Sequence, residues 1–314
     1  MYAKLKLFTG RANPKLADEV SRYAGIPLGE IDLFKFPNDN SFVKIRENVR
    51  GANVFIIQPT CRPVNDSLME LLILIDALRR ASAARINCVI PYYGYARSDK
   101  KDQPRVPITA KLVADLLTVA GADRIVAMDL HSDQIQGFFN IPVDHLTAQL
   151  TFIQYFREHI DLKNAVVVSP DAGGAHRARS LAERLKLGLA IGDKRRVDNT
   201  GSAEILNIIG DVKNKTAIMF DDILDTGGSL TDAARTVKKF GANRIVAACV
   251  HGVLSKDAVE KINNSPIEKL FITNSIPLPE EKKSEKIVQI SIAEMLAEAI
   301  KKIHAEESLS ILFR

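Results

Sequence analysis

The sequence predicts an α/β protein of two tandem domains, each a mainly parallel sheet flanked by helices. Short β-rich runs alternate with amphipathic helical patterns, and the length of 314 residues exceeds that of one typical domain. Residues 121–131 (GADRIVAMDLH) and 241–251 (GANRIVAACVH) are also identical at seven of eleven positions. A spacing of 120 residues fits one α/β domain rather than a solenoid repeat. We therefore expect domains at 1–147 and 148–314, with the last helix able to pack back on the first.

The elements of the first domain follow in order. Residues 4–8 (KLKLF) predict a strand, and Asn13 with Pro14 predicts the cap and first position of a helix. Residues 53–58 and 86–91 predict two further strands. Residues 66–82 and 107–121 predict the helices that follow them.

In the second domain, residues 165–168 (AVVV) and 216–220 (TAIMF) predict buried strands. Ser229 is the expected N-cap of a helix that ends at Gly241. Near the C-terminus, Ser291 and Glu294 have the spacing of a capping box. The helix after it has an apolar face, formed by Ile292, Met295, Leu296, Ala299, Ile300 and Ile303.

Composition favours a globular protein that binds small anions. The hydrophobic fraction is 46%, and 43 basic against 38 acidic residues give a formal charge of +5 without a long basic block, so we expect no nucleic-acid partner. No apolar run approaches the ~20 residues that span a bilayer, and no signal peptide is evident, so we expect no membrane partner. Cys61, Cys88 and Cys249 are predicted to be buried free thiols of a cytoplasmic protein.

The segment 216–230 (TAIMFDDILDTGGSL) carries the clearest chemical signal. Its Thr-Gly-Gly turn lies at a predicted helix N-terminus, where free N–H groups and the helix dipole attract phosphate. Gly227 and Gly228 allow close approach of the backbone, and Thr226 and Ser229 add hydroxyl donors. GxxxxGK[ST] is absent, so this is not a P-loop.

The aspartates before this turn suit the sugar end of the same ligand. Carboxylates accept hydrogen bonds, so Asp221 and Asp222 are candidates to hold vicinal ribose hydroxyls, and a divalent cation could relieve their repulsion. An ordinary capped turn with solvated carboxylates is the alternative, and local chemistry alone does not separate the two.

Other segments have both a chemical and a structural interpretation. His131, after the strand RIVAM, is either a metal ligand or a structural histidine. Asp171, before Gly173 and Gly174, is either a metal ligand or a helix cap. The polar segment 192–204 is either a loop that closes on a substrate or a solvated run of charges. Phe36 is either a base-stacking or a core side chain.

Several of these segments together resemble one family. FDDILDTGGSL resembles the phosphoribosyl-pyrophosphate loop of type I phosphoribosyltransferases and of ribose-phosphate pyrophosphokinases. YYGYARSDKKD, MDLHSDQIQGFF, SPDAGGAHR and KRR occur in the order and spacing of the second family, over almost the whole chain. The resemblance, to class I members, implies two type I phosphoribosyltransferase-like domains. It also implies that Mg²⁺-dependent transfer of the diphosphoryl group of ATP to ribose 5-phosphate yields 5-phosphoribosyl 1-pyrophosphate and AMP, for nucleotide biosynthesis.

The resemblance also implies a role for each matched residue. Lys194 and Arg196 would be catalytic and stabilise the transferred group, while His131 and Asp171 would bind the metal. Ribose 5-phosphate would contact Arg196, Asp221, Asp222, Asp225, Thr226, Gly227, Gly228 and Ser229. ATP would contact Phe36, Asn38, Asp39, Asn40, Arg97, Ser98 and Asp102. A homo-oligomer, a hexamer by resemblance, would share each ATP site between subunits.

Three positions depart from the family pattern. Asn40 replaces the usual acidic residue, Ser98 the usual glutamine, and His176 the lysine of many relatives. The first two leave the selectivity for the nucleotide donor open. Two rival functions also remain at this stage: a phosphoribosyltransferase, which would need no ATP site, and a regulatory paralogue without activity.

Overall fold

The computed structural model describes residues 4–196 and 203–313. The chain divides into two compact units. Unit 1 comprises residues 1–147, 275–277 and 291–314, and unit 2 comprises residues 148–274 and 278–290. The boundary after residue 147 is the expected one, and the last helix lies with unit 1, as the expected packing of that helix on the first domain allows.

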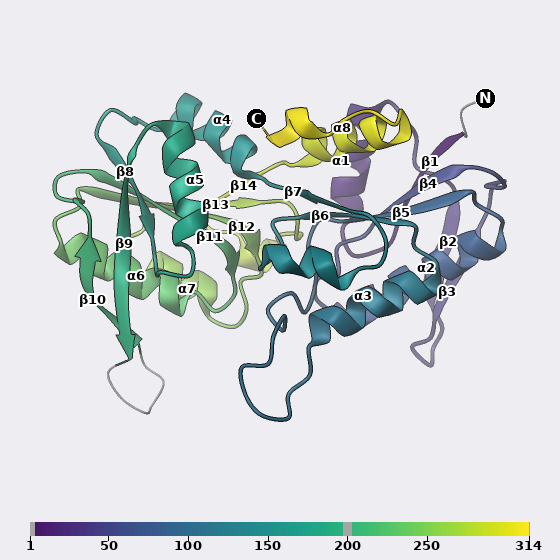
Figure 1. Cartoon of the computed structure of the whole chain (residues 1–314), viewed down its shortest axis with the longest axis horizontal. Helices are drawn as coiled ribbons and strands as arrows, with labels where there is room; N and C mark the ends of the chain where they lie inside the picture. Colours follow the sequence, from purple (N-terminus) through teal and green to yellow (C-terminus); the bar gives the residue numbers. More distant parts are fainter. Residues whose placement is uncertain (1–3, 197–202, 314) are drawn as a thin grey trace. The chain divides into compact units, whose positions relative to one another are not determined.

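Unit 1 contains a five-stranded parallel sheet. Its strands lie in the order β1 (Leu5–Thr9), β4 (Asn53–Ile57), β5 (Arg85–Ile90), β6 (Arg124–Met128) and β7 (Val143–Leu146). A separate antiparallel hairpin is formed by β2 (Ile31–Lys35) and β3 (Ser41–Ile45). Helices α2 (Val64–Arg80) and α3 (Thr109–Ala120) cover one face of the sheet, and α1 (Pro14–Ala24) lies on the other (Figure 1). Asn13 caps α1 as predicted, since its side chain accepts from Leu16 N at 3.3 Å.

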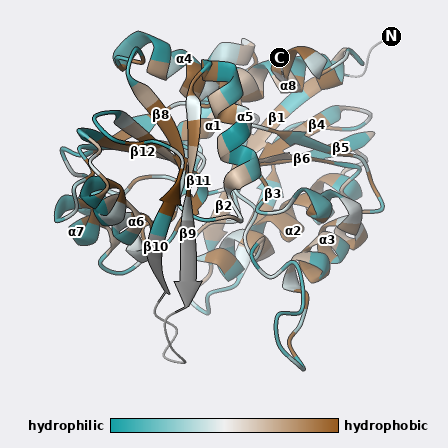
Figure 2. Cartoon of the chain, turned by 60° about the vertical axis from the view of Figure 1, so that its left-hand side comes forward, coloured by the Kyte–Doolittle hydropathy of each residue, from teal (hydrophilic) through white to brown (hydrophobic). Residues whose placement is uncertain are grey.

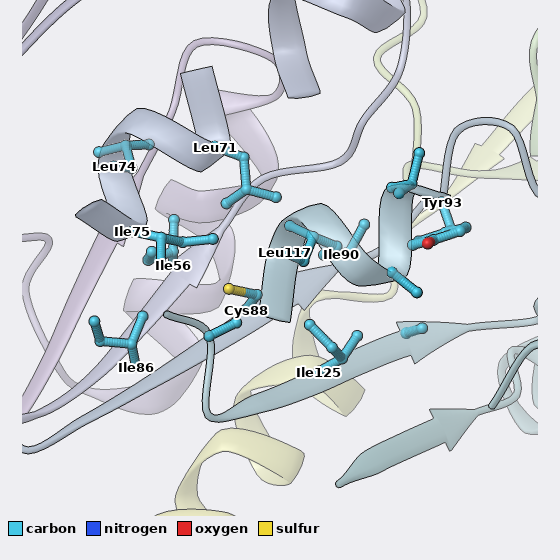
Figure 3. Close-up of a cluster of buried hydrophobic side chains, with 14 of the residues drawn as sticks. Ile56, Leu71, Leu74, Ile75, Ile86, Cys88, Ile90, Tyr93, Leu117 and Ile125 are labelled. Atoms are coloured by element: carbon cyan, nitrogen blue, oxygen red, sulfur yellow. The ribbon is translucent and has the colours of Figure 1, made fainter. Parts of the chain in front are cut away.

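The main core of unit 1 lies between the sheet and helices α2 and α3. Figure 3 shows side chains of α2 directed at those of the central strands, with Leu117 of α3 beside them. The labelled members from the sheet are Ile56, Ile86, Cys88, Ile90 and Ile125, and those from α2 are Leu71, Leu74 and Ile75. Cys61, Cys88 and Cys249 are all free and buried, as predicted.

The C-terminal helix α8 (Ala293–His304) belongs to unit 1 because its apolar face packs on α1, beside which it lies in Figure 1. Leu296 and Ile300 on that face are fully buried. The start of α8 differs in detail from the predicted capping box. The N-cap position is Ile292, and Ser291 Oγ accepts from the amide of Ala293, the first residue of α8, at 3.2 Å while it donates to Glu19 Oε2 at 2.5 Å.

Unit 2 contains a seven-stranded sheet with the following order of strands: β10 (Ala203–Ile209), β9 (Gly188–Arg196), β8 (Ala165–Ser169), β11 (Thr216–Leu224), β12 (Arg244–Gly252), β13 (Lys269–Thr273) and β14 (Ile287–Ile290). Strand β10 is antiparallel to β9, and the other neighbouring pairs are parallel. The central strands β8 and β11 are mostly hydrophobic (Figure 2), as expected for strands buried on both faces. Helices α4 (Gln149–His159) and α5 (Ala175–Leu185) cover one face, and α6 (Gly228–Lys239) and α7 (Ala258–Asn263) the other (Figure 1).

The two units have the same topology. The sheet order β1-β4-β5-β6-β7 in unit 1 matches β8-β11-β12-β13-β14 in unit 2, and in each unit a two-stranded pair follows the first strand and helix. The duplication inferred from the sequence is therefore present, but the two similar segments do not occupy equivalent strands of the two units. Residues 121–131 contain β6, whereas residues 241–251 contain all but the last residue of β12, the counterpart of β5.

Candidate active site

The candidate site of unit 2 lies where its sheet changes direction. Strands β8 and β11 are neighbours, but β8 continues through α5 to β9 on one side, whereas β11 continues through α6 to β12 on the other. The two loops after these strands therefore leave in opposite directions. In open α/β sheets, ligands bind in the crevice outside the carboxyl ends of such strands. Both loops carry residues that the sequence selects.

The acidic pair lies inside β11 and not after it. Sequence analysis ends the strand at Phe220, but β11 continues to Leu224 because it stays paired with β12 through Asp221, Ile223 and Leu224. Pairing with β8 covers only residues 216–219. Phe220, directly before the pair, is fully buried and contacts Phe152 of α4 with ring centroids 5.7 Å apart. Asp221 and Asp222 thus stand on a rigid strand, past the last residue that pairs with β8.

A guanidinium from α5 bridges the two carboxylates. Arg177 Nη2 lies 2.8 Å from Asp222 Oδ1 and 3.5 Å from Asp221 Oδ1, and the Asp222 amide donates to Asp221 Oδ1 at 2.9 Å. Asp222 is buried, whereas the Asp221 side chain is 34% exposed. Burial, together with the hydrogen bond and charge of Asp222, raises the pKa of Asp221 to about 7, and Arg177 opposes the rise.

Sequence analysis does not single out Arg177. Its position in the first turn of α5, directly after a strand and a Gly-Gly pair, is the signal that could have identified it. The partner carboxylates are 44 and 45 residues further along the chain, so only the fold shows which charges this arginine meets.

The loop after β11 forms an open helix N-terminus. The cap of α6 is Gly227, at φ 76°, and not Ser229 as predicted; Ser229 lies in the first helical turn. A Cβ added to Gly228 would meet no heavy atom within 4 Å, so the space in front of this residue is open. Thr226 and Ser229 are exposed. The Asp225 carbonyl accepts from Ser255 N at 2.8 Å, which fixes the base of the loop.

The loop after β8 has a similar design. Asp171 Oδ1 accepts from the amide of Gly174, the cap of α5, at 3.0 Å, and Ser169 Oγ donates to the Asp171 carbonyl at 2.6 Å. Asp171 therefore caps this turn, in agreement with the interpretation of this residue as a helix cap. Its half-buried carboxylate keeps a second oxygen for another ligand. His176 is exposed.

The segment with the predicted catalytic cations is not a loop throughout. Lys194 and Arg196 belong to β9, whose last residues pair with the start of β10. The expected polar loop is thus partly an antiparallel pair. Residues 197–202 and the side chains of Lys194 and Arg196 lie outside the described part of the structure.

Unit 1 has a pocket at the corresponding place, with different chemistry. Residues of the loops after β1 and β4 and of α2 line a pocket of about 260 Å³. Buried Glu70 there binds Arg11, with Oε2 2.6 Å from Nε, and accepts from Gln58. The sequence after β4 is Gln58–Pro63, without an acidic pair or a Gly-Gly turn. The acidic pair and the Gly-Gly turn are therefore found at the end of β11 in unit 2 and not at the end of its counterpart β4 in unit 1.

The first group of predicted ATP contacts lies in the turn of the β2–β3 hairpin. Phe36 is 44% exposed, so it is not a core residue. Its ring meets those of Phe34 and Phe42 edge-on, at centroid distances of 5.2 and 5.6 Å. The turn is closed because Phe36 N donates to Asn40 O, and Asn38 Oδ1 accepts from Asn40 N. Asp39 adopts φ 65° within it.

The second group lies in the connection from β5 to α3. Arg97 and Asp102 are exposed, and Ser98 is half-buried. Ser98 N donates to Tyr95 O at 2.9 Å, and Ser98 O accepts from Ala110 N at 3.1 Å, so the start of this connection is anchored to α3. Both groups belong to unit 1, on separate segments.

His131 follows β6 and is half-buried. The chain leaves the strand at Asp129, which adopts φ 38°. Burial lowers the pKa of His145, and its neutral Nε2 accepts from Leu130 N at 2.8 Å. This bond holds the backbone next to His131.

A metal would find few protein ligands. Across the described residues, no three His, Cys, Asp or Glu side chains form a cluster that could hold an ion. His131 belongs to unit 1 and Asp171 to unit 2, and each offers one ligand. The carboxylate of Asp171 fits Mg²⁺, which keeps several waters and binds through one or two carboxylates plus substrate phosphates, whereas the imidazole of His131 is an unusual ligand for this cation. Within residues 4–196 and 203–313, no helix is long and apolar enough to span a bilayer.

Comparison with known proteins assigns the family. Residues 5–121 match the model of the N-terminal domain of ribose phosphate pyrophosphokinase, and residues 197–314 match the phosphoribosyl synthetase-associated domain. A ribose-phosphate pyrophosphokinase of Clostridium perfringens is 53% identical over 99% of this chain and 98% of its own length. That of Bacillus subtilis is 52% identical over 98% and 97%. The crystal structure of phosphoribosylpyrophosphate synthetase from Mycobacterium smegmatis superimposes with a TM-score of 0.91 at 43% identity, covering 96% of this chain and 99% of that one. The chain belongs to the ribose-phosphate pyrophosphokinase family.

Proposed function

We propose that the protein transfers the diphosphoryl group of ATP to the anomeric hydroxyl of ribose 5-phosphate. The products are 5-phosphoribosyl 1-pyrophosphate, a precursor for nucleotide biosynthesis, and AMP. One observation carries the assignment within the family. At the switch point of unit 2, a strand presents two carboxylates and the next helix presents an open N-terminus, with only residues 223–226 between Asp222 and the helix cap Gly227. These features match the two ends of one phosphorylated pentose.

The sugar phosphate is oriented by contacts at both ends. The 5-phosphate binds the segment 225–229, where N–H groups of the first turn of α6 point outward and the open space at Gly228 admits it. The ribose hydroxyls donate to Asp221 and Asp222, whose positions are fixed by β11 and Arg177. Two anchored ends hold the anomeric carbon at one place, and this lowers the entropic part of the barrier.

ATP binds residues of unit 1. The exposed ring of Phe36 stacks on the adenine, and Asn38, Asp39 and Asn40 of the same turn contact the base or its ribose. Arg97, Ser98 and Asp102 contact the nucleotide from the second segment, which comes from another subunit. Amide and hydroxyl groups stand at positions 40 and 98, so we expect the choice of donor nucleotide to depend on these two residues.

The chemical step is an in-line displacement. The anomeric oxygen forms a bond to the β-phosphorus, the bond from that phosphorus to the bridging oxygen of the α-phosphate breaks, and AMP leaves with the electron pair. The hydroxyl proton passes to water. Lys194 and Arg196 stabilise the charge on the transferred group, which is the main contribution a protein makes to such transfers. Mg²⁺, held by His131, Asp171 and phosphate oxygens, would neutralise phosphate charge when bound.

The proposal includes a homo-oligomer with shared ATP sites, a hexamer by family resemblance, and a cytoplasmic location. Three buried free thiols suit a reducing compartment. The dissociated subunit should then have little activity, which sedimentation combined with activity measurements would reveal.

The decisive experiment measures AMP release from ATP and Mg²⁺ by the purified chain, with and without ribose 5-phosphate. We expect AMP and 5-phosphoribosyl 1-pyrophosphate in equal amounts, and only when the sugar phosphate is present. AMP release at the same rate with and without ribose 5-phosphate would contradict the proposal, and so would the absence of any AMP release. Release of pyrophosphate from 5-phosphoribosyl 1-pyrophosphate on addition of a nucleobase would instead support a phosphoribosyltransferase.

A further inference from the structure

Arg177 is the cation that the fold places against the acidic pair of β11. It lies in the first turn of α5, on the opposite side of the switch point from α6, and its Nη2 contacts both Asp222 and Asp221. Its side chain is 25% exposed, and Asp222 is nearly fully buried. Removal of the arginine from such a partly desolvated pair would leave a buried carboxylate without its compensating charge, which is strongly unfavourable.

The backbone of Arg177 is also anchored. Gln149, the buried first residue of α4, donates from Nε2 to Arg177 O at 3.3 Å and accepts from Ser180 Oγ at 2.9 Å. Two helices thus fix the arginine before any ligand binds. The ion pair between Arg177 and Asp222 connects α5, the helix that follows the loop with Asp171, with β11, the strand that carries both carboxylates.

The surroundings of Asp221 contain no other described cation in contact with it. On its own strand it faces Asp222, and across the ladder its partner is Cys249 of β12, followed by His251. Cys249 is fully buried, and this burial, with the charges of both aspartates, raises the pKa of its thiol well above the ordinary value, so it is neutral. Arg177 therefore carries the compensating charge for two carboxylates that must accept from sugar hydroxyls.

We propose that Arg177 is a positioning residue that keeps the Asp221–Asp222 pair ionised and correctly oriented to accept hydrogen bonds from the hydroxyls of ribose 5-phosphate. This inference rests on the proposed function. Without Arg177, the two adjacent carboxylates share a proton, and a protonated oxygen no longer accepts from the sugar. Burial already raises the pKa of Asp221 to about 7 with Arg177 in place. Loss of the guanidinium raises this pKa further, so one of the two carboxylates is then protonated at neutral pH.

The test compares Arg177→Met with the wild-type chain and with Arg179→Met, a control on the exposed side of the same helix. The readouts are the pH profile of kcat/KM for ribose 5-phosphate and the Kd of this sugar phosphate by calorimetry. For Arg177→Met we expect the acid limb to move up by one to two pH units, and KM at pH 7 to rise about tenfold or more, with a smaller fall in kcat. Arg179→Met should match the wild type.

A second variant separates charge from packing. Arg177→Met combined with Asp222→Asn removes one cation and one anion, so it should move the acid limb back toward the wild-type position. Arg177→Lys should restore part of the affinity. An unchanged acid limb of the pH profile in a folded Arg177→Met protein would overturn the inference. So would a double variant whose acid limb stays at the position found for Arg177→Met. The proposed function would still stand, because it depends on AMP release by the wild-type chain.

Discussion

Replacement of Gly228 by alanine should change stability and substrate binding in opposite directions. Gly228 is the first residue of α6, and an added Cβ would touch nothing within 4 Å in the protein. Alanine is a better helix former than glycine, by at most about 1 kcal/mol inside a helix and about half of that at its end. The melting temperature of Gly228→Ala should therefore rise by about 1–2 °C.

Binding should suffer because the same methyl group enters the space that we assign to the 5-phosphate. Contact between the phosphate and the bare backbone would be lost, and we expect KM for ribose 5-phosphate to rise at least about tenfold, or about 1.4 kcal/mol. KM for ATP should change little. Differential scanning fluorimetry measures the melting temperature, and AMP release at varied concentrations of ribose 5-phosphate measures KM for this substrate.

Gly227→Ala is the matched control on the same turn. Gly227 adopts φ 76°, which costs a residue with a Cβ about 1–2 kcal/mol, so this variant should be less stable than the wild type. A Gly228→Ala protein that is as stable as expected but binds ribose 5-phosphate normally would refute the assignment of the phosphate to this helix end.

Three further predictions test other parts of the site and fold. Asp221→Asn should raise KM for ribose 5-phosphate more than KM for ATP, and equal losses would contradict its role. In the ligand-free wild type, the raised pKa of Asp221, about 7, means that its ionisation costs stability as pH rises from about 4 through 7. Asp221→Asn should remove this loss, so at pH 8 it should gain about 1–2 kcal/mol, less than the full shift because the side chain is partly exposed. Lys194→Ala should lower kcat by about two to three orders of magnitude with an unchanged melting curve; near-native turnover would remove this residue from the mechanism. Leu296→Ala, in the fully buried face of α8, should cost about 2–5 kcal/mol by urea unfolding, whereas a frayed, dispensable helix would give almost no loss.

Local patterns located the loops of the candidate site but did not predict their backbone in detail. Two glycines and two carboxylates in one short segment suit a phosphate and a sugar, although local chemistry alone does not separate this interpretation from an ordinary capped turn. The backbone around them was less predictable. β11 extends through the aspartates because β12 stays paired beside it, and Gly227 caps α6 because a left-handed residue is needed there.

The internal repeat shows the same limit. The two similar windows led to a duplicated domain, and both units do have the same topology. However, the windows lie on strands that are not counterparts, β6 and β12. An apolar sequence of the type RIVA suits any buried parallel strand, so its recurrence indicates a common environment and not a common position.

The sequence by itself determined the fold class, the family and the location of the candidate segments, because buried strands and Gly-Gly turns can be recognised from neighbouring residues. Only the tertiary structure decided that α8 joins unit 1, that Asp221 and Asp222 stand at a switch point, and that Arg177 compensates them. These facts depend on contacts between residues tens or hundreds of positions apart. Such contacts are set by which apolar faces and charges the whole chain can bury together, and no local pattern contains that information.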